Sequence, residues 1–255
     1  MQFTEPQWYT RVTSTNTVLL ERIDAQERLP DGFVIATTEQ TAGRGRGTRH
    51  WHAEAGRDLC CSILCRTEAP ARQLASLAIA TALGIADTLD EVGVAAQTKW
   101  PNDVLVDGAK IAGILCELRP GVAVVGIGLN VSMSAGEAAR IDQRATSILI
   151  ETGSVTAPQD VLPVLLKSLS PRLETWARAG FEGLQLDWAK RCIGLGRQIV
   201  IDDGEVSRRG ILVGFGDAGQ LLLQPLETDD EAAPQPSEIW SGHLRLAGSD
   251  NSTAR

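Results

Sequence analysis

Several features that would indicate a membrane protein, a disulfide framework or a zinc site are missing from this sequence. No apolar run approaches the ~20 residues that a transmembrane helix needs, and the polar start at residues 1–5 is not that of a signal peptide. The five cysteines are odd in number and contain no C-x-x-C pair: Cys60, Cys61, Cys65, Cys116 and Cys192. Such a set is typical of reduced thiols, so we expect a cytoplasmic protein that does not enter a membrane.

The chain also lacks excess positive charge and the usual nucleotide-binding glycine motifs. Its 32 acidic residues outnumber 24 basic ones, and the net charge of -8 argues against binding to bulk nucleic acid. The pattern G-x-G-x-x-G fails twice, because Thr48 and Val131 stand where a third glycine is needed, and no G-K-[ST] is present. His50 and His52 have no third ligand at zinc spacing, so we expect neither zinc nor a cysteine–histidine nucleophile.

What the sequence does contain is a basic glycine-rich segment, residues 43–49, which reads Gly-Arg-Gly-Arg-Gly-Thr-Arg. Glycine at every second position costs too much backbone entropy for a helix or a central strand, so the segment predicts a loop. The guanidinium groups of Arg44, Arg46 and Arg49, together with the loop's N–H groups, can bind an anion. On an acidic protein this indicates a local site for a small anion, although a solvated surface loop has the same composition.

A second polar cluster, Lys-Trp-Pro-Asn-Asp, occupies residues 99–103. The oxygens of Asn102 and Asp103 are ligands that Mg²⁺ accepts beside phosphates, and Lys99 adds a positive charge. The same composition is also typical of a plain turn. Lys110 then enters an apolar strand, where a lysine needs an anionic partner or a path to solvent.

The pattern of elements indicates an α+β fold. Asp107 and Gly108 are a strong hairpin signal, so the strands on either side of them should run antiparallel. Helical periodicity predicts helices that start after Ser14 and at residue 74, and further helices over residues 158–179 and 184–192. Strands are predicted at residues 33–36, 59–64, 97–106 with an interruption at residues 99–103, 110–118, 122–131, 197–201, 209–213, 220–224 and 238–246.

These elements divide the chain into two parts. We expect a mixed, largely antiparallel sheet with helices packed on it over residues 1–193. The short strands that follow predict a small β-barrel over residues 194–248, with an acidic loop at residues 228–237. Residues 249–255 are expected to form a disordered tail.

Five motifs stand in order along the chain. They are Ser14-Thr15-Asn16; Gln40-Thr41-Ala42-Gly43-Arg44-Gly45-Arg46, leading to Trp51; Lys99-Trp100-Pro101-Asn102-Asp103; Lys110-Ile111-Ala112-Gly113-Ile114-Leu115; and Gly126-Ile127-Gly128-Leu129-Asn130. Together they resemble the biotin protein ligases, and the likeness extends from about residue 14 to residue 246. The resemblance implies a catalytic domain similar to class II aminoacyl-tRNA synthetases, followed by an SH3-like barrel.

The resemblance also implies an activity. Such an enzyme uses ATP and Mg²⁺ to activate biotin as biotinyl-5′-AMP, and transfers biotin to one lysine of a biotin carboxyl carrier protein. The residues implied in catalysis are Lys110, Arg46, Arg49 and Asp103. Those implied in binding biotin are Ser14, Thr15, Asn16, Gln40, Gly43, Arg44, Lys110 and Gly113. Those implied for ATP and the adenylate are Arg44, Arg46, Arg49, Trp51, Lys99, Asn102, Asn130 and Arg245, with Mg²⁺ at Asn102 and Asp103.

Two alternatives stay open at this point. Lipoate or octanoate ligases and transferases share the implied fold, but lack a glycine–arginine loop combined with K-W-P-N-D. A biotin-sensing repressor would need a DNA-binding domain, and thirteen residues ahead of Ser14 are too few for one. We therefore expect the monofunctional form, a monomer or homodimer that does not bind DNA.

Overall fold

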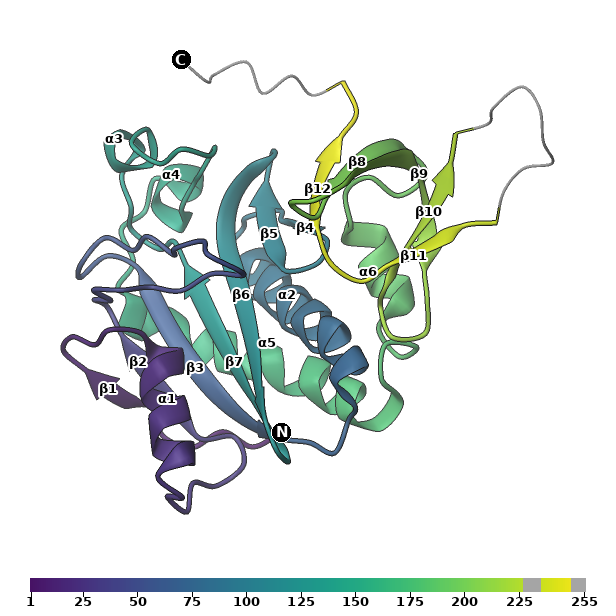
Figure 1. Cartoon of the computed structure of the whole chain (residues 1–255). Helices are drawn as coiled ribbons and strands as arrows, with labels where there is room; N and C mark the ends of the chain where they lie inside the picture. Colours follow the sequence, from purple (N-terminus) through teal and green to yellow (C-terminus); the bar gives the residue numbers. More distant parts are fainter. Residues whose placement is uncertain (227–234, 249–255) are drawn as a thin grey trace.

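A seven-stranded sheet forms the centre of the protein (Figure 1), whose structure, a computed structural model, describes residues 1–226 and 235–248. The strand order is β1-β2-β3-β7-β6-β5-β4. The strands β1 and β2 pair in parallel and the other neighbours antiparallel, which confirms the predicted mixed, largely antiparallel sheet. The strands are β1 (Gln7–Tyr9), β2 (Val34–Thr37), β3 (Leu59–Arg66), β4 (Gln97–Lys99), β5 (Asp103–Val106), β6 (Ala109–Arg119) and β7 (Val122–Leu129).

The hairpin between β5 and β6 forms as the sequence predicts. Both of its turn residues have positive φ, +46° at Asp107 and +78° at Gly108, as a type I′ turn requires. The turn pairs Leu105 with Lys110, and a register shift between Leu105 and Val104 then places Asp103 opposite Gly113. The hairpin therefore brings the K-W-P-N-D segment next to the strand that carries Lys110.

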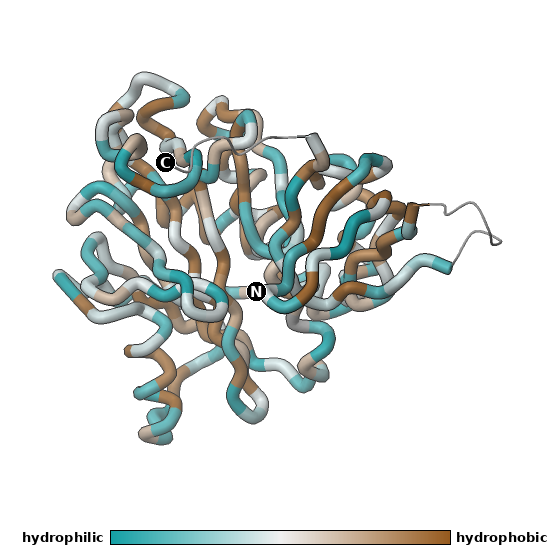
Figure 2. The backbone as a smooth tube through the Cα atoms, turned by 45° about the horizontal axis from the view of Figure 1, so that its top comes forward, coloured by the Kyte–Doolittle hydropathy of each residue, from teal (hydrophilic) through white to brown (hydrophobic). Residues whose placement is uncertain are grey.

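Helices cover the two faces of the sheet unequally. Because side chains alternate along a strand, β7 directs Ala123 and Val125 to one face, where α2 (Leu74–Glu91) and α5 (Pro158–Ala179) bury them in the main core. On the other face, Val122 and Val124 pack against α1 (Thr15–Asp24). Hydrophobic residues follow the strands, and hydrophilic residues gather in the turns (Figure 2). The remaining helical segments are η1 (Ala71–Gln73), α3 (Ala135–Ala138), α4 (Ile148–Thr152) and α6 (Gln185–Arg191).

The face covered by α1 also contains a hollow. After Val124, the positions of β7 that point to this face are Gly126 and Gly128, and the latter pairs with Gly113 of β6. These three positions carry no side chain, so the sheet surface is low beside the N-terminus of α1. The sequence of β7 thus gives this face of the sheet one part that α1 covers and a second part that stays open.

A second, antiparallel sheet follows α6, in the order β11-β10-β9-β8-β12. Phe215 of this sheet packs edge-on against Phe181 and Trp188, with ring centroids 6.1 and 5.9 Å apart. The indole N–H of Trp100 donates to the Gly219 carbonyl at 3.0 Å. The two sheets therefore share one hydrophobic core. The strands are β8 (Gln198–Asp202), β9 (Ser207–Phe215), β10 (Leu221–Pro225), β11 (Ser237–Ile239) and β12 (His243–Leu246).

One predicted strand is wrong. Residues 238–246 form two strands, because the chain turns at Gly242, whose φ of +144° is unfavourable for other residues. The first strand pairs with β10 and the second with β8, so the chain crosses from one edge of the sheet to the other. An SH3-like barrel and the domain boundary at residue 193 stay predictions. Most of the expected acidic loop and the whole expected tail lie outside the described residues.

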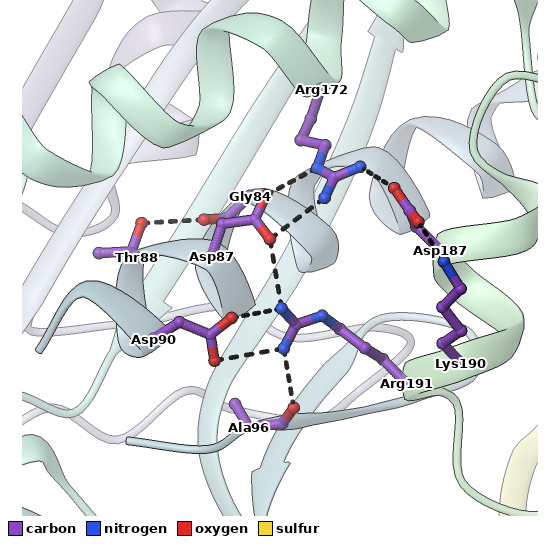
Figure 3. Close-up of polar contacts among 9 residues, drawn as sticks. All are labelled: Gly84, Asp87, Thr88, Asp90, Ala96, Arg172, Asp187, Lys190 and Arg191. Carbon is purple, nitrogen blue, oxygen red and sulfur yellow. Dashed lines mark hydrogen bonds and ion pairs between the residues drawn. The ribbon is translucent and has the colours of Figure 1, made fainter. Parts of the chain in front are cut away.

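Behind the sheet, charged side chains connect three helices (Figure 3). Arg172 of α5 donates to Asp87 of α2 at 2.7 Å and to Asp187 of α6 at 2.6 Å. Arg191 of α6 also pairs with Asp87, and with Asp90. This network joins α6, which leads into the second sheet, to the helices that support the first. No helix in the described part of the chain is long and apolar enough to cross a membrane.

Candidate active site

A cavity of about 130 Å³ lies over the glycine hollow, between the N-terminus of α1, the glycine–arginine loop and strands β6 and β7. Most of the residues predicted for biotin line it, and so do Arg46, Arg49, Trp51, Asn102, Asp103 and Asn130. Gly43 is buried beneath the loop, whereas Lys99 and Arg245 lie outside the lining. The structure thus brings residues of all five sequence motifs to one place.

The N-terminus of α1 forms the polar end of the cavity. Ser14 is the N-cap residue, but its side chain makes no capping hydrogen bond. Instead the first N–H of the helix, at Thr15, donates to the Gln40 side-chain oxygen at 2.8 Å. The Ser62 hydroxyl lies 2.7 Å from Thr15 Oγ1 and 2.6 Å from Asn16 Oδ1. This end therefore presents hydroxyl and amide groups near a helix terminus that favours oxygen acceptors.

The glycine–arginine loop is a small hairpin. Gly45 N–H donates to the Arg49 carbonyl at 2.8 Å, and Trp51 N–H donates to the Gly43 carbonyl at 3.0 Å. The indole of Trp51 then lies in the glycine hollow. A Cβ atom at Gly128 would be 2.2 Å from the ring, and one at Gly113 would be 3.0 Å from it. The Trp51 indole thus packs against Gly113 and Gly128, and this contact holds the loop on the sheet.

Lys110 and Asp103 form the charged end of the cavity. Lys110 Nζ lies 2.6 Å from Asp103 Oδ1, and only 17% and 11% of these side chains are exposed. Asp103 is the anionic partner that the sequence required for Lys110. Lys110 Nζ also lies 5.6 Å from the Trp51 ring centroid, a cation–π distance. A partly buried cation beside an open cavity is suited to bind a second anion.

More positive charge surrounds this pair. Burial lowers the pKa of the Arg46 guanidinium, and the neighbouring Arg49 adds to that effect. Burial likewise lowers the pKa of Lys99, against the attraction of Asp103. Among the residues that the structure describes, neither Arg46 nor Lys99 has an ion-pair partner within 4.0 Å. Desolvated cations without a partner are stabilised by a polyanionic ligand.

His243 extends the site to the second sheet, and sequence reasoning did not identify it. Its Nδ1 lies 3.4 Å from Arg49 Nη1. Burial, with Lys99 and Arg49 nearby, lowers the pKa of His243 to about 4, so the ring is neutral near pH 7 and can accept this contact. Arg245 belongs to the same strand β12, and its side chain lies 3.7 Å from Asp202. His243 thus reaches the cationic end from the second sheet, whereas Arg245 pairs with Asp202 within that sheet.

Asn130 has a structural role at the far wall. Its amide donates to the Thr146 carbonyl at 2.9 Å, and its side chain is buried. This bond ties β7 to the segment 141–145, whose Ile141, Gln143 and Ala145 line the cavity. Asn130 therefore shapes this wall of the cavity. No sequence motif indicated that Ile141, Gln143 and Ala145 would form it.

The residues suggested for Mg²⁺ are not a metal site by themselves. Asn102 donates its amide N–H to the Ile114 carbonyl at 2.6 Å, which leaves its oxygen available, and Asp103 is paired with Lys110. Within residues 1–226 and 235–248, no three His, Cys, Asp or Glu side chains could hold a metal ion together. One carboxylate and one amide suit Mg²⁺ only where phosphate oxygens complete its shell.

Two further residues of the site had no role assigned from the sequence. Glu117 accepts hydrogen bonds from Arg44 and Asn16, which are 73 and 101 residues away in the chain. Gly126 leaves room for Asn16, since a Cβ atom there would be 2.2 Å from Asn16 Oδ1. Two sequence signals could have identified these residues. Glu117 is a glutamate inside an apolar strand, and Gly126 belongs to the glycine pair in β7.

Comparison with known proteins identifies the family. The profile of the Biotin/lipoate A/B protein ligase family matches residues 8–134. A biotin–[acetyl-CoA-carboxylase] ligase of Paracoccus denitrificans is 34% identical over 227 residues, which cover 84% of this chain and 92% of that protein. The chain belongs to the biotin protein ligases. The fold agrees, since the biotin protein ligase from Aquifex aeolicus in complex with biotin and ATP superposes with a TM-score of 0.81 at 29% identity, covering 96% of this chain and 100% of that one.

Another relative is longer than the matched region. The bifunctional ligase/repressor BirA of Bacillus subtilis is 29% identical over 210 residues, which cover 80% of this chain and 65% of that protein. The chain thus spans about two thirds of that relative's length.

Proposed function

We propose that this biotin protein ligase uses ATP to form biotinyl-5′-AMP and then transfers biotin to a lysine of a biotin carboxyl carrier protein. One observation carries the proposal: the cavity joins a polar end at α1 to a cationic end at Lys110 across a floor of glycines. Biotin has a matching order of groups, with a polar ureido ring, a thin aliphatic chain and a carboxylate. Relatives named as biotin ligases support the same substrate.

At the polar end, Thr15, Asn16 and Gln40 would bind the ureido ring. Ser62 fixes Thr15 and Asn16, so these donors and acceptors are held in place before the ligand arrives. The Trp51 ring and the Lys110 side chain lie against Gly113, at 3.0 and 3.1 Å from its Cβ position, so the aliphatic chain would pass beside the indole toward Lys110. Preorganised polar groups lower the cost of orienting the substrate.

In the first step the biotin carboxylate attacks the α-phosphorus of ATP. A carboxyl–phosphate bond forms, the bond to the β-phosphate oxygen breaks, and pyrophosphate leaves. Two anions must approach each other, so Lys110, Arg46 and Arg49 would act by neutralising the charge that accumulates. Asn102 and Asp103 would hold Mg²⁺ jointly with the phosphates, and Mg²⁺ would withdraw charge from their oxygens.

In the second step the amine of the carrier lysine attacks the carbonyl carbon of the anhydride. An amide forms, AMP leaves, and the amine loses a proton. Asp103 is the carboxylate nearest to Lys110 and is the candidate proton acceptor. Magnesium binding and proton acceptance would compete for this one carboxylate, so the two roles belong to different steps.

Transfer to a carrier tests the proposal. Purified protein is incubated with biotin, ATP, Mg²⁺ and a biotin carboxyl carrier domain, and the domain's mass is measured. We expect an increase equal to one biotinyl group, abolished when ATP is omitted or when the acceptor lysine of the carrier is replaced by arginine. Modification by lipoate in place of biotin would contradict the proposal.

A further inference from the structure

The carboxylate of Glu117 lies where three parts of the site meet. One of its oxygens accepts a hydrogen bond from Arg44 Nη2 at 2.7 Å, and the other accepts from Arg44 Nη1 at 3.2 Å. The second oxygen also accepts from Asn16 Nδ2 at 2.8 Å. The glycine–arginine loop, helix α1 and strand β6 are therefore joined through one side chain.

The geometry makes this junction strong. The two parallel N–H···O contacts of Arg44 form the bidentate arrangement in which guanidinium and carboxylate bind best. The Glu117 side chain is 19% exposed and that of Arg44 is 44% exposed, so water screens the pair in part and the bidentate geometry gives it most of its strength. On the other side of the junction, Asn16 is fixed by Ser62 and fits against Gly126. Glu117 is thus held by Asn16 independently of its pair with Arg44.

We infer that Glu117 is a positioning residue that latches the glycine–arginine loop over the cavity. Arg44 stands at the start of the loop, and its guanidinium is engaged by the protein's own carboxylate. A ligand beneath the loop leaves only after this bidentate pair breaks, so the latch slows dissociation. The effect on biotin rests on the proposed function, whereas the effect on the loop does not.

The chain offers a matched control. Arg119 and Asp24 form a second bidentate pair between β6 and α1, at 2.8 and 3.0 Å, but at the other end of the helix from the cavity. Glu117→Gln and Asp24→Asn each remove one negative charge from a bidentate arginine pair that includes a residue of β6. Arg44→Gln breaks the latch from the loop side without touching the sheet.

Two measurements test the latch. In the absence of ligand, trypsin should cut after Arg46 and Arg49 roughly tenfold faster in Glu117→Gln and in Arg44→Gln than in the wild type, a factor that corresponds to about 1.4 kcal/mol. Biotin should dissociate faster by a similar factor in stopped-flow displacement. Asp24→Asn should stay within about twofold of wild type, and the double variant of Glu117 and Arg44 should add little to either single change.

Three results would overturn the inference. Glu117→Gln could behave like Asp24→Asn, which would make the carboxylate merely structural. The two single changes could multiply in the double variant, which would mean that Arg44 acts on the ligand independently of Glu117. If Glu117→Gln does not fold, normal loop cleavage in Arg44→Gln would exclude the latch. Failure of the wild type to bind biotin would refute the proposed function, while the cleavage rates without ligand would still decide the latch.

Discussion

At the scale of single residues, the pair of Lys110 and Asp103 is the centre of the chemistry. Its atoms are 2.6 Å apart, and both side chains are mostly buried, so loss of either partner leaves the other charge uncompensated. Lys110 would also face the charge that develops as biotin attacks ATP.

We predict that Lys110→Ala loses about 2–4 kcal/mol of transition-state stabilisation, by analogy with removal of one preorganised donor. Lys110→Arg keeps the charge and should lose less. Single-turnover formation of the adenylate measures both. Lys167→Ala is the control, because Lys167 pairs with Glu91 on the exposed helical side. Near-normal adenylate formation by Lys110→Ala would show that this lysine only faces solvent.

The glycines of the cavity floor give a second prediction at this scale. In Gly128→Ala the new Cβ atom would lie 2.2 Å from the Trp51 ring, so the indole must leave its place. We expect the free energy of unfolding to fall by about 1–3 kcal/mol, as in an overpacked core, together with loss of biotin affinity. Gly136→Ala is the matched control, since nothing lies within 4 Å of its Cβ position. Equal denaturation midpoints for the two variants would contradict this description of the floor.

At the scale of elements, the glycine–arginine loop is expected to respond to ligands. Three glycines in residues 43–49 make ordering costly, at ~1–2 kcal/mol per residue fixed, and its three arginines repel one another. Biotin and ATP supply the missing negative charge. We predict that biotin with ATP and Mg²⁺ strongly protects the bonds after Arg44, Arg46 and Arg49 from trypsin. Cleavage at the same rate with and without ligands would mean that the loop does not act as a lid.

The network behind the sheet makes stability depend on pH. The Arg172 side chain hydrogen-bonds to Asp187 and lowers the pKa of that carboxyl below its ordinary value of 3.8 (Figure 3). Because the pKa of Asp187 is lowered in the folded protein, its pair with Arg172 contributes fully to stability above about pH 4. This contribution is lost at lower pH, as the Asp187 carboxylate becomes protonated in the folded state. Urea midpoints between pH 5 and pH 2.5 should therefore fall less steeply in Arg172→Met than in the wild type. Parallel pH profiles would contradict the role of this pair.

Local sequence signals predicted many of these elements. Features that depend on contacts between distant parts of the chain could not be predicted from such signals. The turn at Asp107 and Gly108 was predictable because its residues determine their own backbone angles. The break at Gly242 was not, because it depends on which edge of the second sheet each half joins. The sequence indicated that Lys110 needs an anionic partner or a path to solvent, but it did not identify Asp103 as that partner. Glu117 was missed because its partners are distant in sequence and nothing local indicates them.

At the scale of the whole molecule, a net charge of -8 coexists with one concentrated cationic site. The first sheet supplies Lys99 and Lys110 to that site, and the glycine–arginine loop supplies Arg46. The second sheet supplies His243, which contacts Arg49. The shared core, including the Trp100–Gly219 hydrogen bond, holds the two sheets in this arrangement. The fold thus explains how an acidic protein can bind two anions close together.

The central claim is that this site joins biotin to ATP, and isotope exchange between ATP and pyrophosphate tests it most directly. The exchange reports the first step alone and needs no carrier protein. We predict exchange that requires both biotin and Mg²⁺, and that is greatly reduced in Lys110→Ala. Exchange supported by lipoate and not by biotin, or equal exchange with no acid added, would contradict the account.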